Sequence, residues 1–336
     1  MKVQRAAIKS IAMAAIATVA LLGIANGAMA QNVKKFRLGW GTSIDGAGGV
    51  AAKKFAEVLK QKTNGRLELE LFPNSQLGGE VEMLSQIRSG NLDLGLIGSG
   101  VVSGIEPTVQ ATILPFVWKT RDSFWKVING PIGDKILANF DNKGIKGLAW
   151  GTWGERAFLT IGFAVNKPAD LKGKKIRVTQ AQMYLKTMEM MGGNPVPLPW
   201  PEVYTALQTK TVQGVETSIW SAPEAKLYEV TTDLAVTKHF IDTAVFLMNG
   251  PAFKALSPED QKAMIEAAKA GGQAHFEAIS KQTDESIDLM AKKGMKVIYP
   301  DPAPFREAVK PVYDLFKDQA ALVAEIEAAQ RDSAQK

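Results

Sequence analysis

The chain of 336 residues contains no cysteine and only two histidines. Without cysteine it has no disulfide framework, no thiol nucleophile and no thiolate metal ligand. His239 and His275 lie on different expected elements and lack metal-ligand spacing, and no Gly-x-Ser-x-Gly elbow is present. We therefore expect no cofactor, no metal site and no enzyme. An exported lyase or glycoside hydrolase that uses scattered carboxylates is the remote alternative.

Long apolar runs are also scarce. The longest, about residues 11–24, follows a basic start and precedes an Ala-x-Ala sequence that ends at Ala30. This run is shorter than the ~20 residues that a membrane helix needs. A basic segment, a short apolar core and a small-residue site are typical of a secretory signal peptide. We predict that residues 1–30 are such a peptide, cleaved after Ala30, and that the protein works outside the cytoplasm.

Positive charge is not concentrated anywhere. Loss of Lys2, Arg5 and Lys9 with the signal peptide lowers the formal net charge from +6 to +3. No block of lysine and arginine remains, so we expect no nucleic-acid partner.

The first part of the chain alternates short apolar strands with amphipathic helices. We expect strands at about 35–39, 67–72 and 92–97, with helices at 50–62 and 79–89 between them. This β-α-β-α-β order predicts a mostly parallel sheet covered by helices.

The middle of the chain has weaker signals. The glycine-rich loop at 98–104 follows a strand, as a dinucleotide-binding loop would, but no helix–strand unit with a ribose-binding acid follows it. A flexible connection is the favoured interpretation. Further strands are expected at 146–150 and 155–165, separated by a loop at 151–154.

A long helix is predicted near the C-terminus. Residues 258–293 contain no breaker except Gly271 and Gly272, and ~36 helical residues span ~54 Å. A spine across two domains explains this length. A coiled coil is the alternative, although a sustained heptad is missing. A helical pair broken at Pro311 is expected to complete the chain.

The most informative stretch lies between these regions. A short strand carries Arg177, an amphipathic helix is expected at 181–191, and a proline-rich turn occupies 194–200. A second short strand carries Thr217. Because ligands bind outside the carboxyl ends of strands in open α/β sheets, both side chains are candidates for a ligand crevice.

Two arginines are candidate carboxylate anchors. The guanidinium of Arg177 offers a planar two-pronged donor that matches a carboxylate and keeps its charge. The alternative is a surface arginine on an edge strand. Arg156 begins another β-prone run and is the second candidate, but it could instead pair with Glu155 or a surface acid.

Polar candidates accompany these arginines. Glu80 begins a helix, where the helix dipole alone explains a carboxylate; the functional alternative is that it accepts hydrogen bonds from ligand hydroxyls. Thr217 and Gln180 are further hydrogen-bonding candidates. Among seven tryptophans, four fall on expected loops and are candidate walls of a cavity, with core packing as the alternative. These are Trp40, Trp153, Trp200 and Trp220.

An ordered series of short motifs spans nearly the whole mature chain. The series comprises Phe55-Ala-Glu57, Thr63-Asn-Gly65, Phe72-Pro-Asn-Ser-Gln-Leu-Gly78, Gly90-Asn-Leu-Asp-Leu94, Asp170-Leu-Lys-Gly-Lys-Lys-Ile-Arg-Val178, Gly193-Asn-Pro-Val-Pro197, Glu202-Val-Tyr-Thr-Ala-Leu-Gln208, Gly214-Val-Glu216 and Leu227-Tyr-Glu229. With these motifs the chain resembles the substrate-binding proteins of tripartite ATP-independent periplasmic (TRAP) transporters, of the DctP type.

The resemblance implies an α/β fold of the two-lobed periplasmic-binding-protein (Venus-flytrap) kind, with mostly parallel sheets and a long helix across both lobes. On this basis lobe I comprises residues 31–154 plus 243–280, and lobe II comprises 155–242 plus 281–336. The resemblance also implies a periplasmic location, a ligand closed between the lobes and membrane permease subunits as partners. We expect a monomer.

The resemblance further implies that Arg177 is the main ligand contact and that Arg156 is the second arginine of the family. Thr217 departs from the family pattern, which has asparagine or an aromatic residue there. The expected ligand is a small organic acid. Glu80 and the tryptophans favour a hydroxylated or sugar acid, with a simple keto or hydroxy acid or a dicarboxylate as the alternative.

Overall fold

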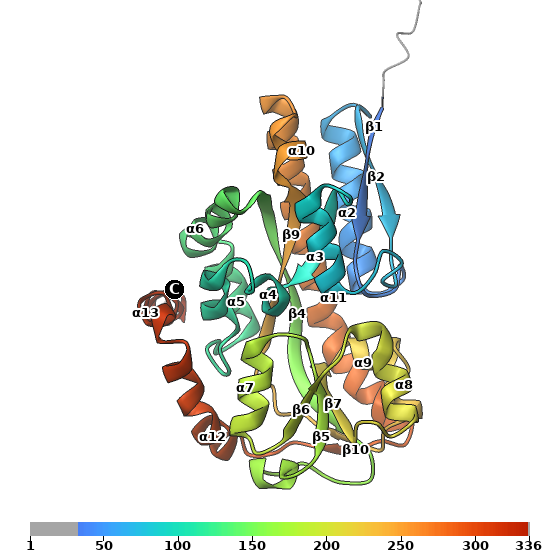
Figure 1. Cartoon of the computed structure of the whole chain (residues 1–336), viewed down its shortest axis with the longest axis vertical. Coiled ribbons are helices and arrows are strands. Elements are labelled where there is room, and N and C mark those ends of the chain that lie inside the picture. Colours follow the sequence, from blue (N-terminus) through green and yellow to red (C-terminus); the bar gives the residue numbers. More distant parts are fainter. Residues whose placement is uncertain (1–32, 335–336) are drawn as a thin grey trace, which may run out of the picture. The chain divides into compact units, whose positions relative to one another are not determined.

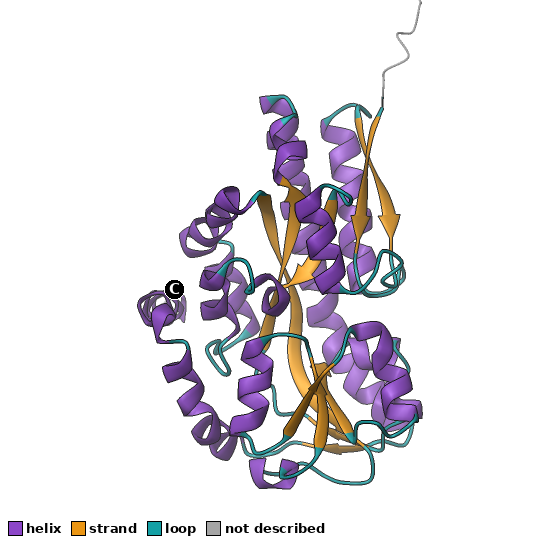
Figure 2. Ribbon diagram, in the orientation of Figure 1, coloured by secondary structure: helices purple, strands orange, loops and turns teal. Residues whose placement is uncertain are grey.

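The computed structural model describes residues 33–334, so the predicted signal peptide lies outside the described residues. Figure 1 labels the elements along the chain, and Figure 2 distinguishes helices from strands. The strands are β1 (Lys34–Gly39), β2 (Leu67–Phe72), β3 (Leu94–Gly98), β4 (Ile145–Thr160), β5 (Lys175–Val178), β6 (Asn194–Pro197), β7 (Gly214–Ser218), β8 (Asp233–Ala235), β9 (Ile241–Asn249) and β10 (Lys296–Ile298). The α-helices are α2 (Ala47–Lys62), α3 (Glu80–Ser89), α4 (Ser99–Val102), α5 (Arg121–Ile128), α6 (Pro131–Ala138), α7 (Gln182–Met190), α8 (Val203–Gln208), α9 (Ser221–Glu224), α10 (Gly250–Lys254), α11 (Pro258–Lys292), α12 (Pro302–Leu315) and α13 (Ala320–Ala334). Within this part of the chain no helix is both long enough and apolar enough to cross a membrane.

The strands follow the order β2-β1-β3-β9-β4-β7-β5-β6, with β8 paired to β4 and β10 paired to β8. The βαβ units give the expected parallel pairs, β1 with β3 and β5 with both β6 and β7. The sheets are nevertheless mixed, because β4 and β9 run antiparallel to their neighbours. The α/β class and the two-lobed arrangement are confirmed.

The strands form two groups, one of β1, β2, β3 and β9 and the other of β5, β6, β7, β8 and β10. The long strand β4 joins these two groups, as the central green ribbon of Figure 1 shows. Its first part pairs with β9, and its last part pairs with β7 and β8. The expected loop at 151–154 is wrong, because these residues belong to β4. The signal for a loop came from Gly151 and Gly154; Gly151 pairs regularly with Ala244, and the register against β9 shifts between Thr152 and Gly154. Such a bulge bends a strand without ending it.

The predicted long helix is confirmed as α11, which is continuous over 35 residues. Gly271 and Gly272 do not break it, because they lie where the helix packs against α2 and β4. A Cβ on Gly271 would lie 2.9 Å from the Ala51 carbonyl oxygen, and one on Gly272 would overlap the Trp150 carbonyl oxygen. The glycine pair therefore allows close packing, and α11 is a spine rather than part of a coiled coil.

Pro311 does not end a helix, contrary to expectation, because α12 runs through it. The lost backbone hydrogen bond is tolerated while Phe305, Val309 and Val312 pack into the core. The break comes after Leu315, and α13 then packs against α5. α13 thus contacts a segment assigned to lobe I, although residues 281–336 were assigned to lobe II; the lobe boundaries stay a prediction.

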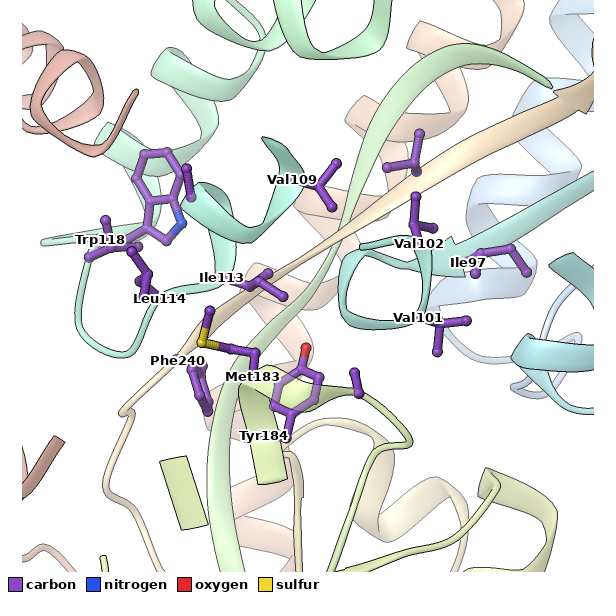
Figure 3. Packing of buried hydrophobic residues seen from close by; sticks show 14 of the residues in the cluster. Ile97, Val101, Val102, Val109, Ile113, Leu114, Trp118, Met183, Tyr184 and Phe240 are labelled. Atoms are coloured by element: carbon purple, nitrogen blue, oxygen red, sulfur yellow. The ribbon is translucent and has the colours of Figure 1, made fainter. Parts of the chain in front are cut away.

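One hydrophobic cluster joins elements from both groups of strands. Figure 3 labels members of this cluster on both helices, Val101 and Val102 of α4 and Met183 and Tyr184 of α7. The approach of these helices is close, because a Cβ on Gly100 would overlap the Tyr184 ring. The sheets are therefore held together by apolar packing on this side of the space between them.

Candidate functional site

A cavity lies between the two groups of strands, and charged, polar and aromatic side chains line it together. Its walls come from the β1–α2 loop, the β3–α4 junction, β4, β5 and the loop after it, β7 and β9. The lining residues are Gly41, Thr42, Glu80, Gly98, Gly100, Val101, Trp153, Arg156, Arg177, Thr179, Gln180, Tyr184, Leu198, Pro199, Trp200, Thr217, Ser218, Trp220, Ser221 and Asp242.

Arg177 enters the cavity from β5 and is 3% exposed. Its Nε and Nη2 atoms donate to the carbonyl oxygen of Leu198 at 3.0 and 2.8 Å. The Trp200 ring lies 5.7 Å from its Cζ atom and further restricts the side chain. The fork is thus held in place by a backbone carbonyl and an indole, while its Nη1 group has no protein partner among the described residues.

The charge of Arg177 is not neutralised within the described chain, where no carboxylate forms an ion pair with it. Burial, with the neighbouring Arg156, lowers the pKa of Arg177 to about 9. A buried cation without a counterion is costly, and an anion placed beside it would remove that cost. An anionic group beside Arg177 would therefore lower the cost of burying its charge.

Arg156 is also buried, but it is paired. Its guanidinium bonds Glu216 through Nε–Oε1 at 2.5 Å and Nη2–Oε2 at 2.8 Å, and bonds Asp242 through Nη1–Oδ2 at 2.8 Å. The alternative of a pair with Glu155 is wrong, because Glu155 bonds Arg121 and Lys238 instead. Neighbours on a strand point to opposite faces, so residues 155 and 156 cannot share a partner.

Arg156 affects the ionisation of the two carboxyl groups that it contacts. Burial alone would raise the pKa of Glu216, but Arg156 lowers it to about 2. Burial raises the pKa of Asp242, which accepts a hydrogen bond from the Tyr184 hydroxyl at 2.7 Å. The Tyr184 ring lies 4.7 Å from Cζ of Arg156. Arg156 thus has two carboxylate partners, whereas Arg177 has none among the described residues.

Glu80 begins α3 and faces the same cavity. Its Oε1 accepts a hydrogen bond from the Gly98 amide at 3.2 Å. Burial, followed by repulsion from Asp242, raises the pKa of Glu80 to about 7. Near neutral pH this carboxyl group can therefore accept a hydrogen bond when ionised or donate one when protonated.

Three of the four candidate tryptophans line the cavity. Trp153 and Trp220 stack with their ring centres 6.1 Å apart, and Trp220 Nε1 donates to the Trp153 carbonyl oxygen at 2.8 Å. Trp153 Nε1 and Glu80 converge above Gly98, where a Cβ would lie 2.9 Å from Nε1 and 3.1 Å from Glu80 Oε2. The cavity therefore combines a flat apolar wall with an adjacent donor and acceptor.

Trp40 is the exception, because it does not line the cavity. It is fully buried in the core beneath α2, where Gly48 leaves room for its ring. Core packing, the alternative for each tryptophan, describes Trp40 correctly.

The structure thus brings eight of the nine candidate residues to one cavity. These are Arg177, Arg156, Glu80, Thr217, Trp220, Trp200, Gln180 and Trp153. Sequence reasoning missed Asp242 and Tyr184. Asp242 had a usable signal, since it is the one acidic residue of the otherwise apolar strand β9. Tyr184 had no usable signal, because a tyrosine on an amphipathic helix is equally well explained by packing in the core.

No group of three side chains able to hold a metal ion occurs among the residues that the structure describes.

Comparisons with known proteins agree with this chemistry. The model of bacterial extracellular solute-binding protein, family 7, matches residues 45–319. The chain is 34% identical to the 2,3-diketo-L-gulonate-binding periplasmic protein YiaO of Escherichia coli, over 79% of this chain and 81% of the relative.

Two solved structures are similar throughout. A TRAP periplasmic solute-binding protein from Xanthobacter autotrophicus with bound β-D-galacturonate has a TM-score of 0.84 and 32% identity, covering 87% of this chain and 99% of that chain. The sugar acid-binding protein DctPAm from Advenella mimigardefordensis in complex with galactonate has a TM-score of 0.85 and 26% identity, covering 90% and 99%.

Proposed function

The chain belongs to bacterial extracellular solute-binding protein family 7, and we propose that it captures a hydroxylated monocarboxylate, such as a uronic or aldonic acid, for a TRAP transporter. Export to the periplasm, delivery of the ligand to membrane subunits and a monomeric state are part of this proposal. Relatives named as periplasmic proteins support the location.

One observation carries the proposal: Arg177 is a buried cation that lines the cavity, and its Nη1 group has no partner among the described residues. A carboxylate would accept hydrogen bonds from this guanidinium and neutralise its charge. Arg156 has a different role in this account. It forms ion pairs with Glu216 and Asp242 and thereby holds these two carboxyl groups in place beside the cavity.

The remaining groups favour a ligand with hydroxyl groups and a single acid. Glu80, Thr217 and Gln180 are hydrogen-bonding partners for hydroxyls, and the paired rings of Trp153 and Trp220 are a wall for a carbon skeleton. A second ligand carboxylate would meet the acidic groups of Glu80 or Asp242. The similar structures with galacturonate and galactonate support a sugar acid over a dicarboxylate or a short keto acid.

Binding and closure are linked in this mechanism. Because the cavity walls come from both groups of strands, a ligand touches both only when they are close together. The ligand therefore binds the closed form more tightly, and this difference in affinity drives closure.

A thermal-shift screen tests the proposal. The panel contains D-galacturonate, D-galactonate, the dicarboxylate galactarate, lactate and neutral D-galactose. At 100 times its Kd a ligand stabilises the folded state by ~2.7 kcal/mol, which is readily detected. We expect a shift with a sugar monoacid and none with D-galactose. A response to D-galactose equal to that of D-galacturonate would contradict a carboxylate anchor, and chemical conversion of a hit would favour an enzyme.

A further inference from the structure

Glu224 connects the two groups of strands at a point outside the ligand cavity. It ends α9, which follows β7, and its carboxylate accepts a hydrogen bond from the backbone amide of Ser43 in the loop between β1 and α2. The same carboxylate occupies the space where a Cβ of Gly46 would stand. Glu224 therefore contacts a loop 181 residues away in sequence, on the other side of the space between the sheets.

The first turn of α2, which lies beside this carboxylate, contains no acidic residue. Gly46 is the N-cap of α2, makes no side-chain cap and is followed by a first turn without acidic residues. The first amides of a helix lack partners within the helix, and the helix dipole favours a negative charge there. Glu224 supplies that charge from the opposite group of strands.

The contact has an electrostatic consequence for an open form. Burial, followed by repulsion from Asp45, raises the pKa of Glu224. The Ser43 amide acts in the opposite direction and favours the ionised carboxylate. If the two groups of strands move apart, Glu224 separates from the N-terminus of α2, and both become exposed to water. The interaction therefore exists only in the closed arrangement.

The position of Glu224 relates it to the ligand without direct contact. It does not line the ligand cavity. It lines a neighbouring hollow together with Ser43, and four residues border both spaces, namely Gly41, Thr42, Trp200 and Ser221. Glu224 thus borders a hollow that adjoins the ligand cavity.

We propose that Glu224 is a positioning residue that latches the closed form by docking its carboxylate at the Ser43 amide and the N-terminus of α2. The inference rests on the proposed capture of a ligand between the two groups of strands. The latch slows ligand release and acts equally on every ligand that fits the cavity, because it touches none of them.

Stopped-flow kinetics with D-galacturonate as the probe tests the latch. We expect Glu224→Ala to release the ligand about tenfold faster, Glu224→Gln to have an intermediate effect, and neither to change the association rate more than about twofold. Glu229→Gln is the matched control, because Glu229 bonds Tyr204 within the same group of strands. Unchanged release from Glu224→Ala, or a loss confined to association, would overturn the proposal.

A second variant guards against a purely structural effect. Gly46→Ala places a methyl group on the Glu224 carboxylate, and its φ of −83° suits alanine. We expect Gly46→Ala to speed release in the wild-type background and to have little effect in Glu224→Ala, as coupled sites require. Additive effects in the double variant would overturn the latch.

A third measurement separates the latch from the proposed function. Backbone hydrogen exchange at Ser43 is followed with and without D-galacturonate. The latch predicts that the Ser43 amide exchanges faster in Glu224→Ala than in wild type, at least with D-galacturonate present, which favours closure. Equal exchange under both conditions would overturn it. If wild type binds no sugar acid in the thermal-shift panel, the proposed function fails, while the Ser43 exchange still decides on the latch.

Discussion

Arg156 of β4 and Glu216 of the antiparallel strand β7 are diagonal neighbours, since Arg156 lies opposite Ser218, and they form a two-point ion pair with distances of 2.5 and 2.8 Å. Both side chains are at most 5% exposed. This pair accounts for one buried arginine of the cavity and leaves Arg177 as the other, without a protein counterion. Arg156 is therefore expected to act on stability, and Arg177 on ligand binding.

Glu216→Gln should destabilise the protein by about 3–5 kcal/mol, because it leaves Arg156 buried with half of its charge compensation. Urea unfolding measures this loss. Glu189→Gln is a control, since Glu189 belongs to an exposed pair with Lys186 and should change stability by less than about 0.5 kcal/mol. A Glu216→Gln variant as stable as the control would contradict a structural role for the pair.

The same pair predicts a dependence on acid. The folded-state pKa of Glu216 is about 2, below its ordinary value of 4.5. Its contribution to stability is therefore complete above pH 4.5 and is lost as the pH falls from about 4.5 towards 2. The difference in unfolding free energy between wild type and Glu216→Gln should shrink over this range. A constant difference from pH 6 to 3 would be inconsistent with the ion pair.

The raised pKa of Glu80 predicts that the unfolding free energy falls as the pH rises. Its folded-state pKa is about 7, above its ordinary value of 4.5, so its unfavourable ionisation begins to weaken the fold as the pH rises from 4.5 to 7. Without ligand, Glu80→Gln should therefore gain stability relative to wild type over this window. Melting temperatures of both proteins at pH 5 and pH 8 provide the test, and parallel curves would refute the burial of an isolated carboxyl group.

Gly272→Ala should destabilise the protein by about 3 kcal/mol, although alanine normally stabilises a helix relative to glycine. The added Cβ would overlap the Trp150 carbonyl oxygen and push α11 away from β4. Gly104→Ala is the control, because its nearest neighbour would be 3.5 Å away. Chemical unfolding of both variants checks this, and a neutral Gly272→Ala would mean that the helix is free to shift.

The sequence predicted those features that depend on local pattern. The strand–helix alternation, the length of α11 and the position of Arg177 at the end of β5 all follow from periodicity and turn residues. The glycines of β4 were misread as a loop because the strand bends there and is buried on both sides. Local pattern does not reveal that tertiary context.

The partners in the cavity could not be predicted in the same way. Arg156 bonds Glu216 and Asp242, which are 60 and 86 residues away, so the choice of partner depends on strand register rather than spacing. Trp40 was misplaced for a related reason. The next residue, Gly41, lines the cavity, whereas the Trp40 indole packs in the core beneath α2.

Arg177→Met should stabilise the ligand-free protein while it abolishes ligand binding. The folded-state pKa of Arg177 is about 9 against an ordinary 12.5, so the unfavourable burial of its charge is complete below pH 9 and disappears as the pH rises towards 12.5. Removing the charge at pH 7 should raise the unfolding free energy by at least about 1 kcal/mol. A lower melting temperature for Arg177→Met would contradict an uncompensated cation.

Isothermal titration calorimetry of Arg177→Lys with the tightest acid from the thermal-shift panel tests the carboxylate anchor most directly. Lysine keeps the charge but cannot reproduce the two-pronged hydrogen bonds, so the account predicts a loss of about 2–3 kcal/mol, or roughly a hundredfold in Kd, with an unchanged fold. An Arg177→Lys variant that binds this acid as tightly as wild type would show that the carboxylate is held elsewhere.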